Sequence, residues 1–376
     1  MDTTAPLALL GGLSPERFMK RHWQKKPLLV RNAIAGFQPL LARKDLFAPA
    51  ARDDVESRLV AREGRGWKLQ RGPFGRRALP PVQQPRWTLL VQGVDLHHRG
   101  VHELLHGFSF VPAARLDDLM ISWASDGGGV GPHFDSYDVF LLQAQGQRRW
   151  RIGRQDDRTL QEGVPLKILR NFQAEEEYVL DAGDMLYLPP GYAHDGVALG
   201  ECQTYSIGFR APARAELARE LLQRLADEAG DLDERLYRDP SQPATAAPGA
   251  IPPALRDFAQ DALAAALKDP KALDRVLGEY LTEPKPGVWF DPADAPQALQ
   301  AVVLDPRTRM LHDGGHVFVN GESWRAGGRD ATLMRKLADR RRLSPRELAG
   351  ASEAACSLLL SWCEAGWLHA DEGATP

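Results

Sequence analysis

Short apolar runs separated by turn residues dominate the first 211 residues of the chain. Seven of these runs read as strands: PLLVR (27–31), TLLVQ (88–92), LMISW (119–123), VFLL (139–142), WRI (150–152), MLYL (185–188) and TYSIGF (204–209). Strands of this length and spacing favour a sandwich or barrel over alternating strand–helix units. One helix is predicted near the N-terminus, in LSPERFMKRHW, because Ser14 can cap it and Pro15 suits its first turn.

From Pro212 onward the apolar residues recur at helical spacing. Three segments, 213–229, 254–267 and 270–284, are predicted to form a small helical bundle. The stripe that the first segment must bury consists of Leu217, Leu221, Leu222 and Leu225. The remaining segments are a hairpin at 316–326, which turns at Asn320-Gly321, and helices near 331–341, 345–348 and 353–365. A hairpin with helices of this kind resembles a winged-helix module.

Composition places the chain among globular proteins with more than one domain. With 376 residues it is too long for one typical core, and 47 basic against 50 acidic residues give a net charge of −3. This balance makes no whole-chain case for nucleic-acid binding, no apolar run is long enough for a membrane span, and the N-terminus does not read as a signal peptide. The three scattered cysteines, Cys202, Cys356 and Cys363, argue against a disulfide framework and for a reducing, cytoplasmic setting.

Candidate chemistry begins in GGGVGPHFDSYDVFLLQAQGQRRW (127–150), where three glycines form either a plain turn or a close approach of the backbone to a metal or substrate. His133 and Asp135 are two apart, so in an extended segment they share a face with Tyr137. Much later, a strand ends in a Pro-Pro-Gly turn and His194 follows. Two histidines and one carboxylate are the ligand set of non-heme Fe(II) oxygenases, which keep positions open for co-substrate and O₂.

An arginine strengthens this hypothesis. If QRRWRI is a strand, Arg148 lies on the face of Trp150 and Ile152. An arginine on an apolar face is rarely buried without a partner, and the carboxylate of a bound ligand would supply one. A 2-oxoacid that chelates iron at one end needs such a cation at its other end. Ser122, in LMISW, could add a hydroxyl to the same carboxylate.

Each of these features also has a plainer interpretation. His133 and Asp135 could form a hydrogen-bonded pair within a loop, and His194 could be an ordinary turn histidine. Arg148 could pair with a protein carboxylate such as Asp184 instead of a ligand.

As a set, the motifs resemble those of a known family. They are HWQKKPLLVRNA (22–33), WTLLVQGVD (87–95), DDLMISWASDGGGVGPHFDSYDVFLLQAQGQRRWRIG (117–153), AGDMLYLPPGYAHDG (182–196) and YSIGFRAP (205–212). The chain is similar to bacterial ribosomal oxygenases of the JmjC cupin superfamily, the YcfD-like ribosomal-protein arginine hydroxylases. The resemblance implies an α+β protein with three parts: a JmjC-type double-stranded β-helix (1–211), a helical dimerisation region (212–290) and a winged-helix-like domain (291–376).

The same resemblance implies the cofactor chemistry. His133, Asp135 and His194 would ligate Fe(II), with 2-oxoglutarate and O₂ as co-substrates. Arg148 would bind the distal carboxylate of 2-oxoglutarate, and its fixed charge and forked donors suit that role. Ser122 is a further candidate contact, and Thr204 and Ser206 near the last catalytic strand are others.

The implied substrate is an arginine side chain of the large-subunit ribosomal protein numbered sixteen, hydroxylated at carbon 3 by a protein that forms a homodimer. Tyr137 or Asp126 could steer the guanidinium by a cation–π contact or an ion pair. Two other functions stay open: a JmjC-type protein demethylase, and a cupin that binds metal without oxidative chemistry. Direct nucleic-acid binding also stays open, since Arg340–Arg342 could touch RNA but is more typical of a solvated helix end.

Overall fold

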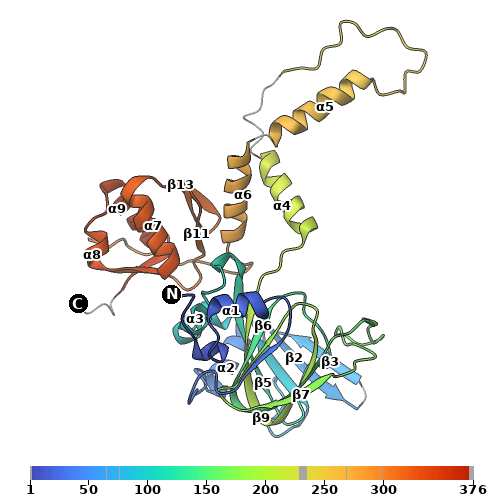
Figure 1. Ribbon diagram of the computed structural model, residues 1–376, viewed down its shortest axis with the longest axis vertical. Coiled ribbons are helices and arrows are strands. Elements are labelled where there is room, and N and C mark those ends of the chain that lie inside the picture. Colours follow the sequence, from blue (N-terminus) through green and yellow to red (C-terminus); the bar gives the residue numbers. More distant parts are fainter. Residues whose placement is uncertain are drawn as a thin grey trace. The chain divides into compact units, whose positions relative to one another are not determined.

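The computed structural model describes residues 2–64, 66–75, 77–227, 235–267, 269–296 and 298–371. The chain divides into two compact units, Met1–Ala211 and Pro212–Pro376 (Figure 1). The boundary that we expected near residue 290, between a helical region and a C-terminal domain, stays a prediction.

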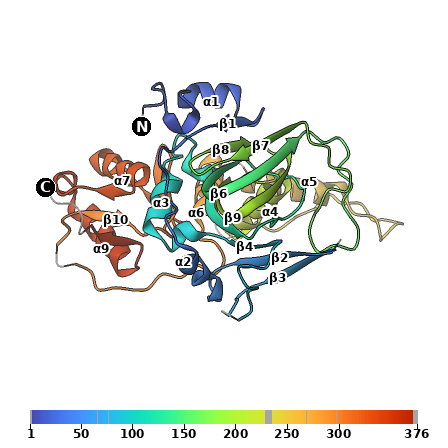
Figure 2. The same cartoon turned by 90° about the horizontal axis from the view of Figure 1, so that it is seen from below.

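The first unit is built on one nine-stranded antiparallel sheet, which confirms the predicted barrel. Its strands are β1 (Leu28–Val30), β2 (Ser57–Glu63), β3 (Gly66–Arg71), β4 (Trp87–Val91), β5 (Leu116–Ala124), β6 (Val139–Gly153), β7 (Glu176–Leu180), β8 (Met185–Leu188) and β9 (Ala193–Phe209). They follow the order β1-β8-β6-β9-β5-β4-β2-β3, with β7 paired to β6. Figure 2 shows these strands curving around a common interior.

Short helices accompany this sheet. They are α1 (Pro15–Arg21), α2 (Arg43–Phe47) and α3 (Arg99–His106), with 3-10 turns at Ala8–Leu10, Pro49–Ala51, Val94–Leu96 and Ala113–Arg115. The predicted N-terminal helix is confirmed, because the Ser14 hydroxyl accepts a hydrogen bond from the Arg17 N–H at 3.3 Å and Pro15 occupies the first turn.

Alternation along the strands separates two apolar faces. On β6, Phe140 and Leu142 join the main core, where the ring of Phe18 from α1 lies 5.4 Å from that of Phe140. Val139 and Leu141, which point the other way, belong to a second and smaller cluster. Each fully buried side chain of this size contributes roughly 1.5–3 kcal/mol. Helices cover the first face, so the second face lines the interior of the curved sheet and is where functional groups can gather.

The longest strands, β6 and β9, were predicted only in part. The runs VFLL and WRI are the two ends of β6, which crosses two register shifts between Gln143 and Gln147. At Gly146, whose φ is +63°, a Cβ would lie 2.2 Å from the Glu201 carbonyl oxygen, so a close backbone crossing requires glycine there. Polar residues in the middle of each strand hid this continuity from the apolar pattern.

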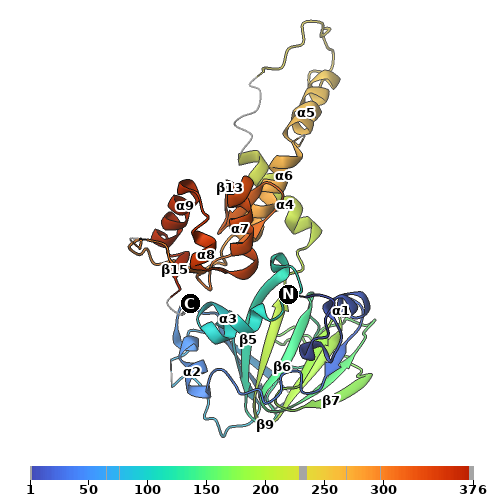
Figure 3. The ribbon, with the colours of Figure 1, turned by 60° about the vertical axis from the view of Figure 1, so that its left-hand side comes forward.

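The second unit combines helices with two small antiparallel sheets. Its elements are α4 (Arg214–Asp227), α5 (Pro253–Ala266), α6 (Pro270–Thr282), β10 (Val302–Leu304), β11 (Met310–His312), β12 (His316–Val319), β13 (Glu322–Arg325), α7 (Gly328–Arg340), β14 (Arg342–Leu343), α8 (Pro345–Leu348), α9 (Glu353–Glu364) and β15 (Leu368–Ala370). The sheets are β14-β10-β15 and β11-β12-β13. Figures 1 and 3 show α7, α8 and α9 side by side. The predicted hairpin is confirmed, with positive φ at both Asn320 and Gly321.

Helix α6 joins the hairpin to α4. A Cβ at Gly278 would lie 2.4 Å from the ring of Phe318, so α6 packs directly on β12. On its other side, the Tyr280 hydroxyl donates to Glu216 of α4 at 2.9 Å. By contrast, every described side chain of α5 between residues 253 and 265 is exposed.

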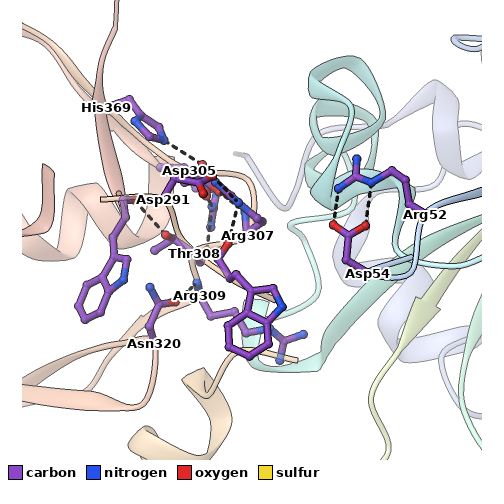
Figure 4. A network of polar contacts seen from close by, with 12 residues as sticks. Arg52, Asp54, Asp291, Asp305, Arg307, Thr308, Arg309, Asn320 and His369 are labelled. Atoms are coloured by element: carbon purple, nitrogen blue, oxygen red, sulfur yellow. Dashed lines mark hydrogen bonds and ion pairs between the residues drawn. The ribbon is translucent and has the colours of Figure 1, made fainter. Parts of the chain in front are cut away.

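A network of charges holds the winged-helix part together (Figure 4). The Asp305 carboxylate accepts hydrogen bonds from Arg307 Nε at 2.8 Å and Nη2 at 3.0 Å, and the His369 ring Nε2 lies 2.8 Å away. The same figure draws a pair that belongs to the first unit, Arg52 with Asp54. Elsewhere, all three cysteines are free thiols, as predicted, and no helix in the described parts of the chain could span a membrane.

Candidate metal and co-substrate site

Three predicted metal ligands meet at one end of the barrel. His133, Asp135 and His194 each offer a ligand atom, and these atoms all lie within 4.8 Å of one another. Among the described residues no other such group of histidine, cysteine or carboxylate side chains is found. His133 and Asp135 lie in the loop between β5 and β6, not in the extended strand that we expected, whereas His194 is the second residue of β9.

Backbone hydrogen bonds bring the two ligand segments together. The His133 N–H donates to the His194 carbonyl at 3.0 Å, and the His194 N–H donates back at 2.8 Å. The Gly191 N–H, in the Pro-Pro-Gly turn, donates to the Asp135 carbonyl at 2.7 Å. This isolated bridge places the two imidazole rings 4.3 Å apart, centre to centre. The structure therefore brings His194 together with the loop pair His133 and Asp135, as the metal-site hypothesis requires.

The orientation of both rings suits metal binding. The Nδ1 atom of His133 lies 2.9 Å from the Gly131 carbonyl, and Nδ1 of His194 lies 3.0 Å from the Tyr192 carbonyl. A carbonyl only accepts, so each ring carries its proton on Nδ1 and keeps the Nε2 lone pair for a metal. Burial, and then the neighbouring His133, lower the pKa of His194 to about 4, which keeps that ring neutral at physiological pH. Two imidazole nitrogens and one carboxylate form a set that fits Fe(II).

Arg148 is buried in the barrel, where Cys202 and Asp195 offset the effect of burial on its pKa only in part. It is 3% exposed and lies on the inner face of β6, as the strand prediction required. Its Nη1 donates to Ser122 Oγ at 3.1 Å and to Thr204 Oγ1 at 3.3 Å, and Nη2 donates to the Gly196 carbonyl at 3.2 Å. Its Nε has no hydrogen-bond partner, and no ion pair to Arg148 occurs in the described chain. A buried guanidinium with only neutral acceptors is poised for an anionic ligand.

Asp184, named above as an example of a protein carboxylate that could pair with Arg148, is engaged elsewhere. Asp184 pairs with Arg31 at 2.5 Å and accepts from the Asn32 N–H at 2.8 Å. The structural alternative for Arg148, a pair with Asp184, is therefore wrong.

The residues proposed to steer the substrate lie near the rim. Tyr137 lies two residues after Asp135 in the same loop, here called the metal loop, and is 40% exposed. Asp126 is also exposed, but its Oδ1 accepts from the Gly200 N–H at 2.8 Å, which gives the carboxylate a structural task in β9. Their contacts with a substrate stay predictions, as does any role of Ser206.

Sequence reasoning missed the groups that orient the site. The carbonyls of Gly131 and Tyr192 fix the two rings, and the carbonyl of Gly196 helps to hold Arg148. Backbone acceptors leave no side-chain signature, so no motif could have named them. Trp150 was visible, because the two-residue period of a strand placed it beside Arg148.

Comparison with known proteins agrees with the metal and co-substrate site described above. Residues 103–217 match the model of the JmjC domain, and residues 265–369 match that of the ROXA-like winged helix. The chain is 33% identical to the ribosomal protein uL16 3-hydroxylase of Escherichia coli K12 over 81% of its own length and 84% of that protein. It is 34% identical to a probable ribosomal oxygenase of Haemophilus influenzae, over 59% of this chain and 55% of that protein.

Solved structures agree with these sequence relatives. An X-ray structure of E. coli YcfD superposes with a TM-score of 0.83 at 31% identity and covers 94% of this chain and 96% of that one. A YcfD complex with cobalt and 2-oxoglutarate has a TM-score of 0.81 at 30% identity, with 95% and 98% covered.

Barrel, ligand triad and winged helix together define a JmjC-type oxygenase with an appended winged-helix domain. Within that class, the chain belongs to the ribosomal oxygenase family.

Proposed function

We propose that this protein is an Fe(II)- and 2-oxoglutarate-dependent oxygenase that hydroxylates an arginine side chain of ribosomal protein uL16 at carbon 3. The oxygenase part rests on the buried guanidinium of Arg148, which forms no ion pair in the described chain and lies in the barrel that also holds the ligand triad. The substrate part is supported by the name of the E. coli relative, of which the chain covers 84%.

Each residue of the site has a definite task in this proposal. His133, Asp135 and His194 hold Fe(II), which supplies open positions for a 2-oxoacid and O₂. Arg148 binds the distal carboxylate of 2-oxoglutarate through charge-assisted hydrogen bonds, while Ser122 and the Thr204 hydroxyl keep its Nη1 in place. Burial of this contact excludes water and so strengthens it.

Overall, one oxygen atom enters a C–H bond of the substrate and the other enters succinate, with release of CO₂. A cationic arginine side chain must reach the metal past the rim of the barrel. Tyr137, exposed beside the metal loop, can contact the guanidinium through its ring, and Asp126 can attract it by charge. The guanidinium itself stays chemically unchanged in the product.

The test is a direct product analysis. Purified uL16, Fe(II) and 2-oxoglutarate are incubated with the enzyme or with Asp135→Ala, and peptides are read by mass spectrometry. We expect one added oxygen on one arginine, and succinate formed with it, only with the unaltered enzyme. Loss of methyl groups with release of formaldehyde would identify a demethylase. No turnover of 2-oxoglutarate at all would identify a non-oxidative cupin.

We further propose that the protein forms a homodimer through residues 212–290. Leu225 of the α4 stripe is buried within the chain, but Leu222 is 52% exposed, and on α5 Leu263 is 66% and Phe258 38% exposed. Apolar side chains recurring along helices are usually covered by a partner. Light scattering at micromolar concentration should give twice the chain mass; Leu263→Glu should give a monomer, and Gln260→Glu on the same helix should not. A monomer for the unaltered chain would contradict this.

A ribosomal protein substrate and three free thiols support a cytoplasmic location. Direct nucleic-acid contact is not part of the proposal. Helix α9, the second helix of the α8–α9 pair, carries Glu353 and Glu364 and neither lysine nor arginine.

A further inference from the structure

Trp150 lies close to residues at both ends of the proposed co-substrate site. The guanidinium carbon of Arg148 is 5.0 Å from the centre of the indole, and the indole is 5.8 Å from the ring of His194. Trp150 is 5% exposed. One rigid ring therefore contacts both the cation that would bind the distal carboxylate and a ligand of the metal.

Gly196 provides the surface on which both side chains rest. It is the direct β9 partner of Trp150 in the sheet. A Cβ at this position would lie 2.5 Å from Cζ3 of Trp150 and 2.8 Å from Nε of Arg148, closer than real Cβ contacts occur. Its φ is not in the left-handed region, so glycine is required here for space. Its carbonyl also accepts from Arg148 Nη2.

The glycine run before the metal loop packs against the same segment. A Cβ at Gly129 would lie 2.5 Å from the carbonyl oxygen of Gly196. The Gly127 N–H donates to the Ala198 carbonyl at 3.0 Å, and the Ala198 N–H donates to Gly128 at 2.9 Å. The run thus packs closely on the β9 backbone that carries Gly196, while the predicted approach to a metal or substrate stays a prediction.

We propose that Trp150 and Gly196 are positioning residues that hold the guanidinium of Arg148 ready for the distal carboxylate of 2-oxoglutarate. The inference rests on the proposed function, in which Arg148 binds that carboxylate. The missing side chain at Gly196 lets Arg148 lie flat on the backbone, and the indole covers it and keeps it from turning. A cation fixed before binding loses less conformational freedom when the ligand arrives.

Gly196→Ala is the sharpest variant. Its methyl group would displace Trp150 and Arg148 by an amount on the order of 1 Å, so we expect the 2-oxoglutarate Kd to rise about tenfold or more. Calorimetry on the full-length, Mn(II)-loaded protein measures this Kd, and titration of the metal-free protein with Mn(II) measures metal affinity. The latter should change little, because the atoms nearest to the added methyl group belong to Trp150 and Arg148 and not to a metal ligand. Gly75→Ala is the matched control, since nothing lies within 4 Å of a Cβ there.

Two variants of Trp150 test how its ring holds the guanidinium of Arg148. Trp150→Phe keeps a smaller aromatic face and should weaken 2-oxoglutarate binding about threefold, whereas Trp150→Leu removes the cation–π contact and should weaken it more. If the added methyl acts through the indole, the double variant Gly196→Ala/Trp150→Leu binds 2-oxoglutarate no worse than Trp150→Leu alone.

The outcomes separate this inference from the proposed function. An unaltered protein that fails to bind 2-oxoglutarate overturns the proposed function. If the unaltered protein binds 2-oxoglutarate and Gly196→Ala binds it equally well, only the positioning role is overturned. Equal losses of Mn(II) and 2-oxoglutarate affinity would also overturn it, since they indicate general damage. Should Gly196→Ala not fold, Trp150→Phe decides: an unchanged 2-oxoglutarate Kd rejects the role, and a rise with unchanged Mn(II) affinity supports it.

Discussion

Each of the two units buries a charged side chain, but the partners of that side chain differ. In the second unit, the Asp305 carboxylate is 7% exposed and is surrounded by donors from Arg307 and His369. In the barrel, Arg148 is 3% exposed and meets only two hydroxyls and one carbonyl, with Nε unpartnered. Asp305 has an oppositely charged partner within the chain, whereas Arg148 forms no ion pair in the described residues.

This difference separates a structural charge from a functional one. Burial alone would raise the pKa of Asp305, but hydrogen bonds from Arg307 and His369 outweigh it and lower that pKa. Burial lowers the pKa of Arg148, and the electrostatic effects of Cys202 and Asp195 offset this only in part. A buried charge without its partner destabilises the fold. Its presence beside a metal-ligand triad is explained if a ligand supplies the missing charge. Variants in the barrel should therefore change activity, and variants around Asp305 should change stability.

The largest effect is expected at the metal. Asp135→Ala removes the one anionic ligand, so turnover of 2-oxoglutarate and hydroxylation should fall to background while thermal unfolding stays close to that of the unaltered protein. Succinate production and circular dichroism measure the two quantities. Normal turnover by Asp135→Ala would refute the triad.

The complementary change is Asp305→Asn, which should act on stability alone. Weaker hydrogen bonds at this position should lower the free energy of unfolding by about 1.5–3 kcal/mol. Hydrogen exchange should therefore become faster in peptides of the second unit. Because the folded-state pKa of Asp305 lies below its usual 3.8, its contribution is present above that value and is lost as pH falls through the folded-state pKa. The variant should lack this acid dependence and bind 2-oxoglutarate normally. Loss of 2-oxoglutarate binding in Asp305→Asn would contradict the claim that Asp305 acts on stability and not on function.

The smallest effect is expected at a neutral partner of Arg148. Ser122→Ala removes one hydrogen bond to Nη1 but leaves Thr204 in place. Loss of such a bond is worth about 0.5–1.5 kcal/mol, so the 2-oxoglutarate Kd should rise by roughly two- to tenfold. Calorimetry on the Mn(II)-loaded protein can resolve this. An effect as large as that of removing the guanidinium would mean that Ser122, not Arg148, dominates the contact.

Much of this molecule could be predicted from its sequence, for identifiable reasons. The triad, Arg148 and Ser122 are side chains whose chemistry and strand period appear directly in the sequence. The geometry of the metal loop did not follow, since a single bridge to His194, and not a regular strand, holds His133. The full lengths of β6 and β9 were hidden by glutamines and glycines at register shifts. Gly196 carries no chemical signal at all, because its role is the absence of a side chain.

Replacement of the guanidinium by an unbranched apolar side chain tests the central claim most directly. Arg148→Met should leave the chain as stable as before, or more stable, because an uncompensated buried charge has been removed. The same variant should bind 2-oxoglutarate more weakly by about 2–5 kcal/mol, well over tenfold in Kd. Calorimetry and thermal unfolding of the Mn(II)-loaded variant and unaltered protein, with and without 2-oxoglutarate, give both values. A destabilised variant that still binds 2-oxoglutarate like the unaltered protein would show that Arg148 is structural and would contradict the account.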